Sequence, residues 1–257
     1  MGSKDKFGKK EGFGIQNWDD GSVYKGNFTA DESRGWGIYY YSNGDIYKGH
    51  FENGIKEGYG EYHYNKGALY YGEFSGDTQH GICYEIWNGN GNSYYLGSYK
   101  NGVKEGIGTY VWEDNAKYEG EWKDNYINGF GIYYFQNGRI YEGQWKDGEM
   151  NGYGEFTWVD GKKYFGFYEE DKKNGFGIYY WLNDKFSIGF WKYGKRHGIS
   201  KVFLRNQIKY IRWINGKKDK IYSKEDDFLN SLQPNERKYV NYLLWDINKL
   251  KEFMRIK

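Results

Sequence analysis

Residues 141–163 read YEGQWKDGEMNGYGEFTWVDGKK, and five of these residues are glycine: Gly143, Gly148, Gly152, Gly154 and Gly161. The glycines are spaced like those of a phosphate-binding loop, but such a loop occurs once, between a strand and a helix. Here Tyr141, Gly143 and Trp145 alternate, so they would share one face of a strand. The stretch KDGEMNG has turn composition, and a second alternating run follows it. We therefore predict a β-hairpin and reject the nucleotide-loop interpretation.

The same pattern recurs along most of the chain. Tyr-x-Gly begins every 23 residues, except for one interval of 25, at Tyr24, Tyr47, Tyr70, Tyr95, Tyr118, Tyr141 and Tyr164. An eighth unit begins at Ser187, where the tyrosine is lost, and the pattern decays after Tyr210. The predicted division is a partial repeat at 1–23, eight repeats of about 23 residues at 24–209, a decayed basic linker at 210–222 and a helical segment at 223–257.

Glycine within a strand is unfavourable unless its lack of a side chain is needed. We expect these glycines to leave room for Tyr141, Trp145 and Trp158, whose rings would lie over bare backbone. One hairpin alone is marginally stable, so each repeat must be stabilised by its neighbours.

The unit Y-x-G-x-(W/F/Y)-x-x-G-x-x-x-G-x-G resembles the MORN repeat (membrane occupation and recognition nexus), and the resemblance covers roughly residues 1–209. It implies an all-β repeat fold, an elongated single-layer twisted antiparallel sheet of stacked β-hairpins, here with a C-terminal α-helical tail. It also implies a scaffold in a cytoskeletal setting, such as ciliary axonemes and their radial spokes or the cortex of protists.

Composition supports folded β-structure, because aromatics make up 22% of the 257 residues and disordered glycine-rich chains are poor in aromatics. Cys83 is the single cysteine, which excludes an intramolecular disulfide and indicates a reducing, intracellular compartment. The N-terminus has no apolar stretch typical of a secretory signal. No apolar run has the length needed to cross a bilayer.

A second aromatic stripe is predicted on the other face of the sheet. Large side chains alternate there in several repeats, and the candidate partner-binding residues are Trp36, Tyr40, Phe130, Tyr134, Phe176 and Tyr180. A single-layer sheet cannot cover both of its faces, so this stripe would bind a partner helix or extended peptide in a groove. The alternative is that twist and local packing hide most of these rings.

The segment 192–223 carries ten basic residues and one acidic residue. Its candidate anionic-partner patch comprises Lys192, Lys195, Arg196, Lys201, Arg205, Lys209 and Arg212. Such clusters favour anionic lipid headgroups or acidic proteins, and they also occur as solvated surfaces. Nucleic acid is an unlikely partner because the sequence contains no nucleic-acid-binding module.

Beyond Ser223 the spacing becomes helical. Apolar residues at intervals of three and four form a candidate docking stripe of Val240, Leu243, Ile247, Leu250 and Met254. We expect this helix to cap the open end of the sheet, because an unpaired edge invites association. A docking or dimerising helix, and hence a homodimer, is the alternative.

The sequence contains no candidate catalytic, cofactor-binding or metal-binding set. His80 and His197 occupy equivalent repeat positions, so they do not indicate a metal cluster. Cys83 takes a glycine position and is interpreted as a packing residue. No nucleophile comes with a base and an orienting group. We therefore predict a non-enzymatic scaffold or adaptor in the cytoplasm, without cofactors. A peripheral membrane adaptor that binds anionic phospholipid through residues 192–220 is the alternative function.

Overall fold

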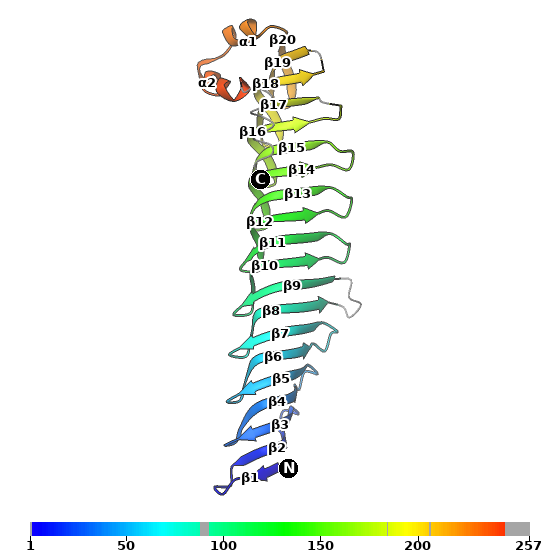
Figure 1. Cartoon of the computed structure of the whole chain (residues 1–257), viewed down its shortest axis with the longest axis vertical. Helices are drawn as coiled ribbons and strands as arrows, with labels where there is room; N and C mark the ends of the chain where they lie inside the picture. The colour runs from blue at the N-terminus through cyan, green and yellow to red at the C-terminus, as the bar shows by residue number, and fades with distance from the viewer. Residues whose placement is uncertain (1, 88–92, 184, 206, 245–257) are drawn as a thin grey trace. The chain divides into compact units, whose positions relative to one another are not determined.

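The computed structural model describes residues 2–87, 93–183, 185–205 and 207–244. These residues form twenty strands of one open antiparallel sheet, followed by three short helices. The predicted all-β repeat of stacked hairpins is therefore confirmed. The chain divides into two compact units, residues 1–127 and 128–257, which are taken in turn below (Figure 1).

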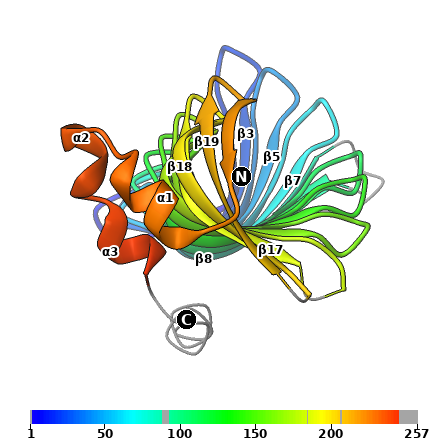
Figure 2. The same ribbon diagram turned by 90° about the horizontal axis from the view of Figure 1, so that it is seen from above.

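Unit 1 contains eleven complete strands among its described residues, and each of them pairs with the strand that precedes or follows it in the chain. Figure 2 shows successive hairpins of this unit, marked by β3, β5 and β7, rotated about a common axis, which is the twist expected of a sheet. The strands are β1 (Gly2–Lys4), β2 (Lys10–Asn17), β3 (Val23–Thr29), β4 (Glu32–Tyr40), β5 (Ile46–Glu52), β6 (Ile55–His63), β7 (Leu69–Ser75), β8 (Thr78–Trp87), β9 (Ser93–Lys100), β10 (Val103–Val111) and β11 (Lys117–Lys123).

Unit 2 continues the pattern from β12, which begins at the boundary, and ends with the helices. The strands pair antiparallel in chain order. They are β12 (Tyr126–Tyr134), β13 (Ile140–Lys146), β14 (Glu149–Thr157), β15 (Lys163–Glu169), β16 (Lys172–Tyr180), β17 (Phe186–Lys192), β18 (Lys195–Leu204), β19 (Gln207–Ile214) and β20 (Lys217–Tyr222). The helices are α1 (Glu225–Asn230), α2 (Pro234–Arg237) and α3 (Val240–Leu243).

The core is built from one tyrosine per repeat lying over a pair of glycines. Gly143 of β13 pairs with Gly154 of β14, and a Cβ on either glycine would overlap the Tyr141 side chain. The Tyr141 hydroxyl donates a hydrogen bond to the carbonyl of Gln144 at 3.0 Å. Equivalent rings are at most 1% exposed at Tyr24, Tyr47, Tyr70, Tyr95, Tyr118, Tyr141 and Tyr164. We call this side of the sheet the tyrosine face and the opposite side the outer face.

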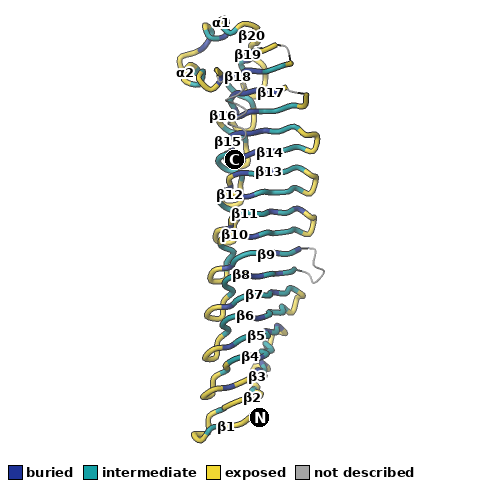
Figure 3. Tube along the Cα trace, in the orientation of Figure 1, coloured by how far each residue is buried: buried dark blue, intermediate teal, exposed yellow. Residues whose placement is uncertain are grey.

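The remaining glycines of each repeat shape the backbone. Asp147 and Gly148 both have positive φ, 51° and 88°, as a two-residue hairpin turn requires. Gly152 has φ 86° at a bulge, where the pairing shifts between Gly143 and Trp145. Burial follows the same period, with buried positions along the strands and exposed positions at the turns (Figure 3).

The C-terminal segment is helical, as predicted, but it lies against a face of the sheet, whereas the sequence predicted that it would cap the sheet edge. Its described part forms three short helices, and Pro234 starts the second of them at the first helical position, with a capping box between Gln233 and Glu236. The helices lie against the outer face of unit 2 (Figure 2). They pack there against an apolar cluster that includes Phe176, Ile178 and Ile188, and Phe228 of α1 also contacts Tyr222 of the last strand, β20. Residues 245–257 lie outside the described part of the chain.

Candidate functional site

One apolar side chain per repeat projects from the outer face of unit 1. We call this row the outer stripe; its members are between 64% and 67% exposed, on strands β2, β4, β6, β8 and β10: Phe13, Trp36, Tyr59, Ile82 and Ile107. Their cross-strand partners are polar: Asn27, His50, Glu73, Ser98 and Glu121. Exposed apolar side chains therefore alternate with polar side chains along the row, and Ile15 and Leu96 on the same face are also exposed, at 43% and 50%.

The six residues predicted to bind a partner fall into three environments. Trp36 in unit 1 is 64% exposed and Phe130 in unit 2 is 49% exposed. Tyr40, Tyr134 and Tyr180 are half-buried. The last residue of the set, Phe176, is 8% exposed. The sequence pattern did not distinguish these environments, because the repeat gives equivalent positions while the tail covers only the last of them.

The chain's own helix shows how the outer face holds a helix. The Tyr239 and Phe190 rings have centroids 4.5 Å apart, and those of Tyr242 and Phe176 are 5.1 Å apart. Phe176 and Phe190 are direct partners on β16 and β17. Three residues of helix rise about 4.5 Å, close to the spacing of about 4.8 Å between strands. The rise of three residues from Tyr239 to Tyr242 therefore matches the distance from β17 to the neighbouring strand β16.

Polar contacts hold the tail in place. The Arg212 guanidinium donates to the Glu236 carboxylate at 2.9 Å and to the Ser231 carbonyl at 2.8 Å. The Phe228 ring stacks on Tyr210 at 4.8 Å. Of the predicted docking stripe, Leu243 is buried and Val240 is half-buried against the same cluster. Ile247, Leu250 and Met254 lie outside the described residues.

The predicted basic patch is divided between internal and surface positions. Arg212 is paired with Glu236, Lys201 is buried, and Arg196 lies among aromatic rings. Exposed positions are held by Lys192, Lys195, Arg205 and, beyond the predicted set, Lys217, Lys218 and Lys220. Lys209 is half-buried. Residue counts alone could not separate these groups, because strand alternation and the decayed repeat decide which basic side chains turn inward.

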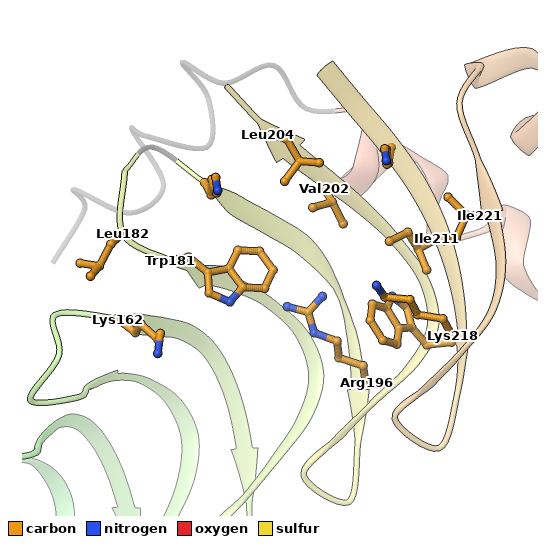
Figure 4. A pocket seen from close by; sticks show the side chains of 12 residues that line it. Lys162, Trp181, Leu182, Arg196, Val202, Leu204, Ile211, Lys218 and Ile221 are labelled. Carbon is orange, nitrogen blue, oxygen red and sulfur yellow. The ribbon is translucent and has the colours of Figure 1, made fainter. Parts of the chain in front are cut away.

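A pocket opens on the tyrosine face near the end of unit 2. Its volume is about 680 Å³, and its walls come from the end of β16 to β20 together with Lys162 (Figure 4). We call it the Arg196 pocket. The Arg196 side chain lies in it beside Trp181 and donates to Ser187 Oγ at 2.8 Å. The sequence signal for the pocket is the loss of the repeat tyrosine at Ser187, although that loss alone does not predict a cavity.

Half-buried cations also recur on the tyrosine face of several repeats. Lys56, Lys104, Lys173 and Arg196 begin or nearly begin the second strand of their repeats. The Lys173 ammonium lies 4.4 Å from the centre of the Trp158 ring and 4.8 Å from that of Tyr164. Burial lowers the pKa of Lys173 from 10.5 to about 8. In the sequence these four residues occupy the same position of their repeats. The repeat unit, which was defined by its glycine and aromatic residues, does not include this position.

Comparison with known families assigns the repeat. The MORN repeat family matches eight segments, residues 6–23, 24–46, 47–68, 95–117, 118–138, 141–163, 164–184 and 188–199. Together they cover more than half of the chain. The chain belongs to the MORN repeat family. The predicted resemblance is thereby confirmed.

The unit that begins at Tyr70 is a MORN-like hairpin that falls outside the matched segments. Its strands β7 and β8 pair as the others do, and Tyr70 is fully buried. Cys83 replaces the second glycine and faces Gly72. Burial raises the pKa of the Cys83 thiol to about 12, which keeps it protonated at neutral pH. This MORN-repeat chain thus tolerates one small side chain at a glycine position, as the packing interpretation of Cys83 expects.

Two solved structures resemble this MORN-repeat chain at a low level. One is the TCP domain of SAS-4 (dCPAP) from Drosophila melanogaster, in complex with a proline-rich motif of Ana2 (dSTIL), at 12% identity and TM-score 0.39, covering 70% of this chain and 90% of that one. The other is the TCP10 domain of CPAP from Danio rerio, at 9% identity and TM-score 0.45, covering 82% and 100%. Likeness at this level carries no argument about partners. Comparison with curated proteins found no match.

Metal-binding groups and membrane-spanning helices are both absent from the described residues. Within residues 2–87, 93–183, 185–205 and 207–244, no group of three or more His, Cys, Asp and Glu side chains could hold a metal ion. Within the same ranges, no helix is both long and apolar enough to span a membrane.

Proposed function

We propose that this MORN-repeat protein is a non-catalytic scaffold that binds protein partners in a cytoskeletal assembly. The observation that carries the proposal is the outer stripe of unit 1, where apolar side chains from five repeats are exposed in a row. A row of exposed apolar side chains at a regular spacing suits a partner whose own apolar side chains recur at the same spacing. The setting, axonemal or cortical, follows from the family resemblance alone.

The partner segment that fits the stripe best is an amphipathic helix. Successive stripe residues are two strands apart, a distance of about 9.6 Å. Seven residues of an α-helix rise about 10.5 Å, so one heptad would advance by one repeat. The contacts of Tyr239 and Tyr242 with the outer face of unit 2 provide an example within the same chain. An extended peptide has no comparable precedent here.

Charge gives the partner helix a second property. Residues 1–127 contain 13 basic and 19 acidic residues, and Glu73 and Glu121 flank the stripe directly. A helix whose apolar heptad positions are flanked by lysine or arginine would complement this surface. Such attraction would speed association and would weaken with salt.

Copurification from the cells that express the protein tests this proposal. We expect partners retained by the tagged wild-type chain to be lost from the variant Trp36→Ser/Tyr59→Ser. The matched control is Val159→Ser/Tyr193→Ser, which removes apolar side chains of similar exposure from turns. Partners that survive in both variants, or that vanish from both, would contradict a role for the stripe.

Binding to an anionic phospholipid surface is a second candidate, favoured by one observation. The turns β17–β18 and β19–β20 are joined by a hydrogen bond from the Gly216 amide to the Arg196 carbonyl at 2.8 Å. They bring exposed Lys192, Lys195 and Lys217 to one end of the sheet. Flotation with phosphatidylserine vesicles should show salt-sensitive binding that reversing these three charges abolishes. The lack of flotation at low salt would eliminate this candidate.

A further inference from the structure

The Arg196 pocket lies where the repeat departs from its pattern. In seven preceding units a buried tyrosine fills the tyrosine face, above two glycines or, in the unit of Tyr70, above Gly72 and Cys83. In the eighth unit Ser187 stands at the tyrosine position and Ser200 at the second glycine position, directly across from Gly189. In the next strand Lys209 and Ile211 occupy the corresponding places, opposite Val202 and Ser200. The pocket opens beside these positions, along Val202, Leu204 and Ile211, and its volume of about 680 Å³ is within the range of small-molecule sites.

One wall of the pocket is apolar. Trp181 and Leu182 lie on one side, and Val202, Leu204, Ile211 and Ile221 lie on strands β18 to β20 (Figure 4). Trp213 closes the end near Arg196, and its indole N–H donates to Ser200 Oγ at 2.7 Å. The polar edge of this indole is therefore satisfied within the protein, and Arg196 and Lys218 lie over its ring at 5.0 and 5.8 Å from the ring centre.

Among the described residues, the charges that line the pocket are all positive. They belong to Lys162, Lys185, Arg196, Lys209 and Lys218, and the twelve lining residues include no Asp or Glu. Lys162 is paired with Asp160 at 2.5 Å, outside the lining. A pocket with an excess of positive charge around apolar walls complements an anion that has an apolar body.

Arg196 is the central cation. Its guanidinium lies between 4.9 and 5.6 Å from the ring centres of Trp181, Trp213, Trp191 and Tyr179. These rings hold the planar group in one place, and one of its five N–H donors is used by Ser187. A carboxylate is the acceptor whose geometry matches the guanidinium fork.

We infer that the Arg196 pocket binds a single-chain amphipathic carboxylate, with its head group at Arg196 and its hydrocarbon chain along Val202, Leu204 and Ile211. The inference is independent of partner binding at the outer stripe, because the two sites share no residue. It also differs from adsorption to a charged membrane, since one ligand molecule binds in the pocket.

Isothermal titration of the full chain with dodecanoate, below its micelle concentration, tests the inference. We expect saturable binding of one ligand per chain and no binding of dodecyltrimethylammonium, which has the same tail and the opposite charge. Arg196→Gln should weaken binding at least tenfold. The control Lys192→Gln removes an exposed charge outside the pocket and should leave the affinity unchanged.

Two further variants keep the test decisive if Arg196→Gln is poorly folded. Val202→Tyr/Leu204→Trp copies Tyr179 and Trp181 of the preceding repeat onto two lining positions, so it should fill the pocket and abolish binding. Ile221→Glu places a negative charge on an exposed wall position and should weaken binding at least tenfold. No binding by the wild-type chain, equal binding of the cationic amphiphile, or full binding by the filled variant would each overturn the inference.

Discussion

At the scale of single residues, two neighbouring tyrosines of the tyrosine face both have buried rings, but only one of their hydroxyls has a hydrogen-bond partner. Tyr141 and Tyr168 lie next to each other, with ring centres 5.2 Å apart, and both are buried. The Tyr141 hydroxyl has a carbonyl partner, whereas the Tyr168 hydroxyl is buried with no partner among the described residues. At the positions equivalent to Tyr168, neighbouring repeats use Trp145 and Trp191.

This contrast predicts opposite effects of one substitution. Tyr141→Phe should lower the free energy of unfolding by about 1 kcal/mol, since it removes a satisfied hydrogen bond. Tyr168→Phe should leave stability unchanged or raise it by about 1 kcal/mol, since it removes an unsatisfied buried hydroxyl. Urea unfolding of both variants measures the difference. Equal losses in the two variants would show that the hydroxyl contacts are wrongly assigned.

Lys173 predicts a pH-dependent effect at the same scale. Its pKa is about 8 in the folded chain against 10.5 unfolded, so between these pH values the unfolded state binds more protons and stability rises with pH. Below pH 8 Lys173 is charged in the folded chain, and burying this charge lowers the free energy of unfolding. Lys173→Met, which copies Met150 of the preceding repeat, should therefore stabilise the fold by about 2 kcal/mol. This gain should disappear above about pH 10.5. A gain that is independent of pH would contradict the assignment.

At the scale of elements, the C-terminal helices are held by a few buried side chains. Leu243 is 1% exposed and its neighbour Leu244 is 43% exposed. Leu243→Ala should therefore cost about 2–3 kcal/mol and release the helices, while Leu244→Ala should cost less than about 0.5 kcal/mol. Hydrogen exchange over residues 225–243 measures the release. Similar exchange in the two variants would mean that the helices do not depend on this contact.

The same helices make a prediction about self-association. A chain that stops after Ser223 would expose Phe176, Phe190 and Ile188 of the outer face, so light scattering should show a larger mass than for the intact chain. A tail that mediates dimerisation would give the opposite result, a smaller mass after truncation. An unchanged mass would contradict both accounts.

The repeat pattern of the sequence predicted most of the fold but fewer features of the candidate functional site. The glycine and tyrosine period predicted the hairpins, because each glycine is required by the ring above it, as Tyr141 and Gly154 show. The position of the tail was predicted wrongly, since the choice between the sheet edge and the outer face depends on which distant apolar groups meet. The burial of Lys201 was equally hidden, because Lys201 pairs with Tyr210 of β19 in the decayed part of the repeat.

At the scale of the whole molecule, the repeat places equivalent residues at regular intervals, and function arises where they differ. Residues 1–127 carry a net charge of −6 and residues 128–257 carry +8. The outer stripe belongs to the acidic unit. The Arg196 pocket and the C-terminal helices belong to the basic unit. Each unit thus offers a partner different chemistry on the same repeated framework.

The central claim is that the outer stripe of unit 1 receives a helix from a partner protein. Photo-crosslinking from benzoylphenylalanine in place of Tyr59, with Tyr193 as the exposed control position, tests it most directly. We predict crosslinks from position 59 alone, to a segment with apolar residues at heptad spacing that becomes helical when it binds the purified chain. Equal crosslinking from both positions, or a crosslinked segment that binds without forming a helix, would contradict the claim.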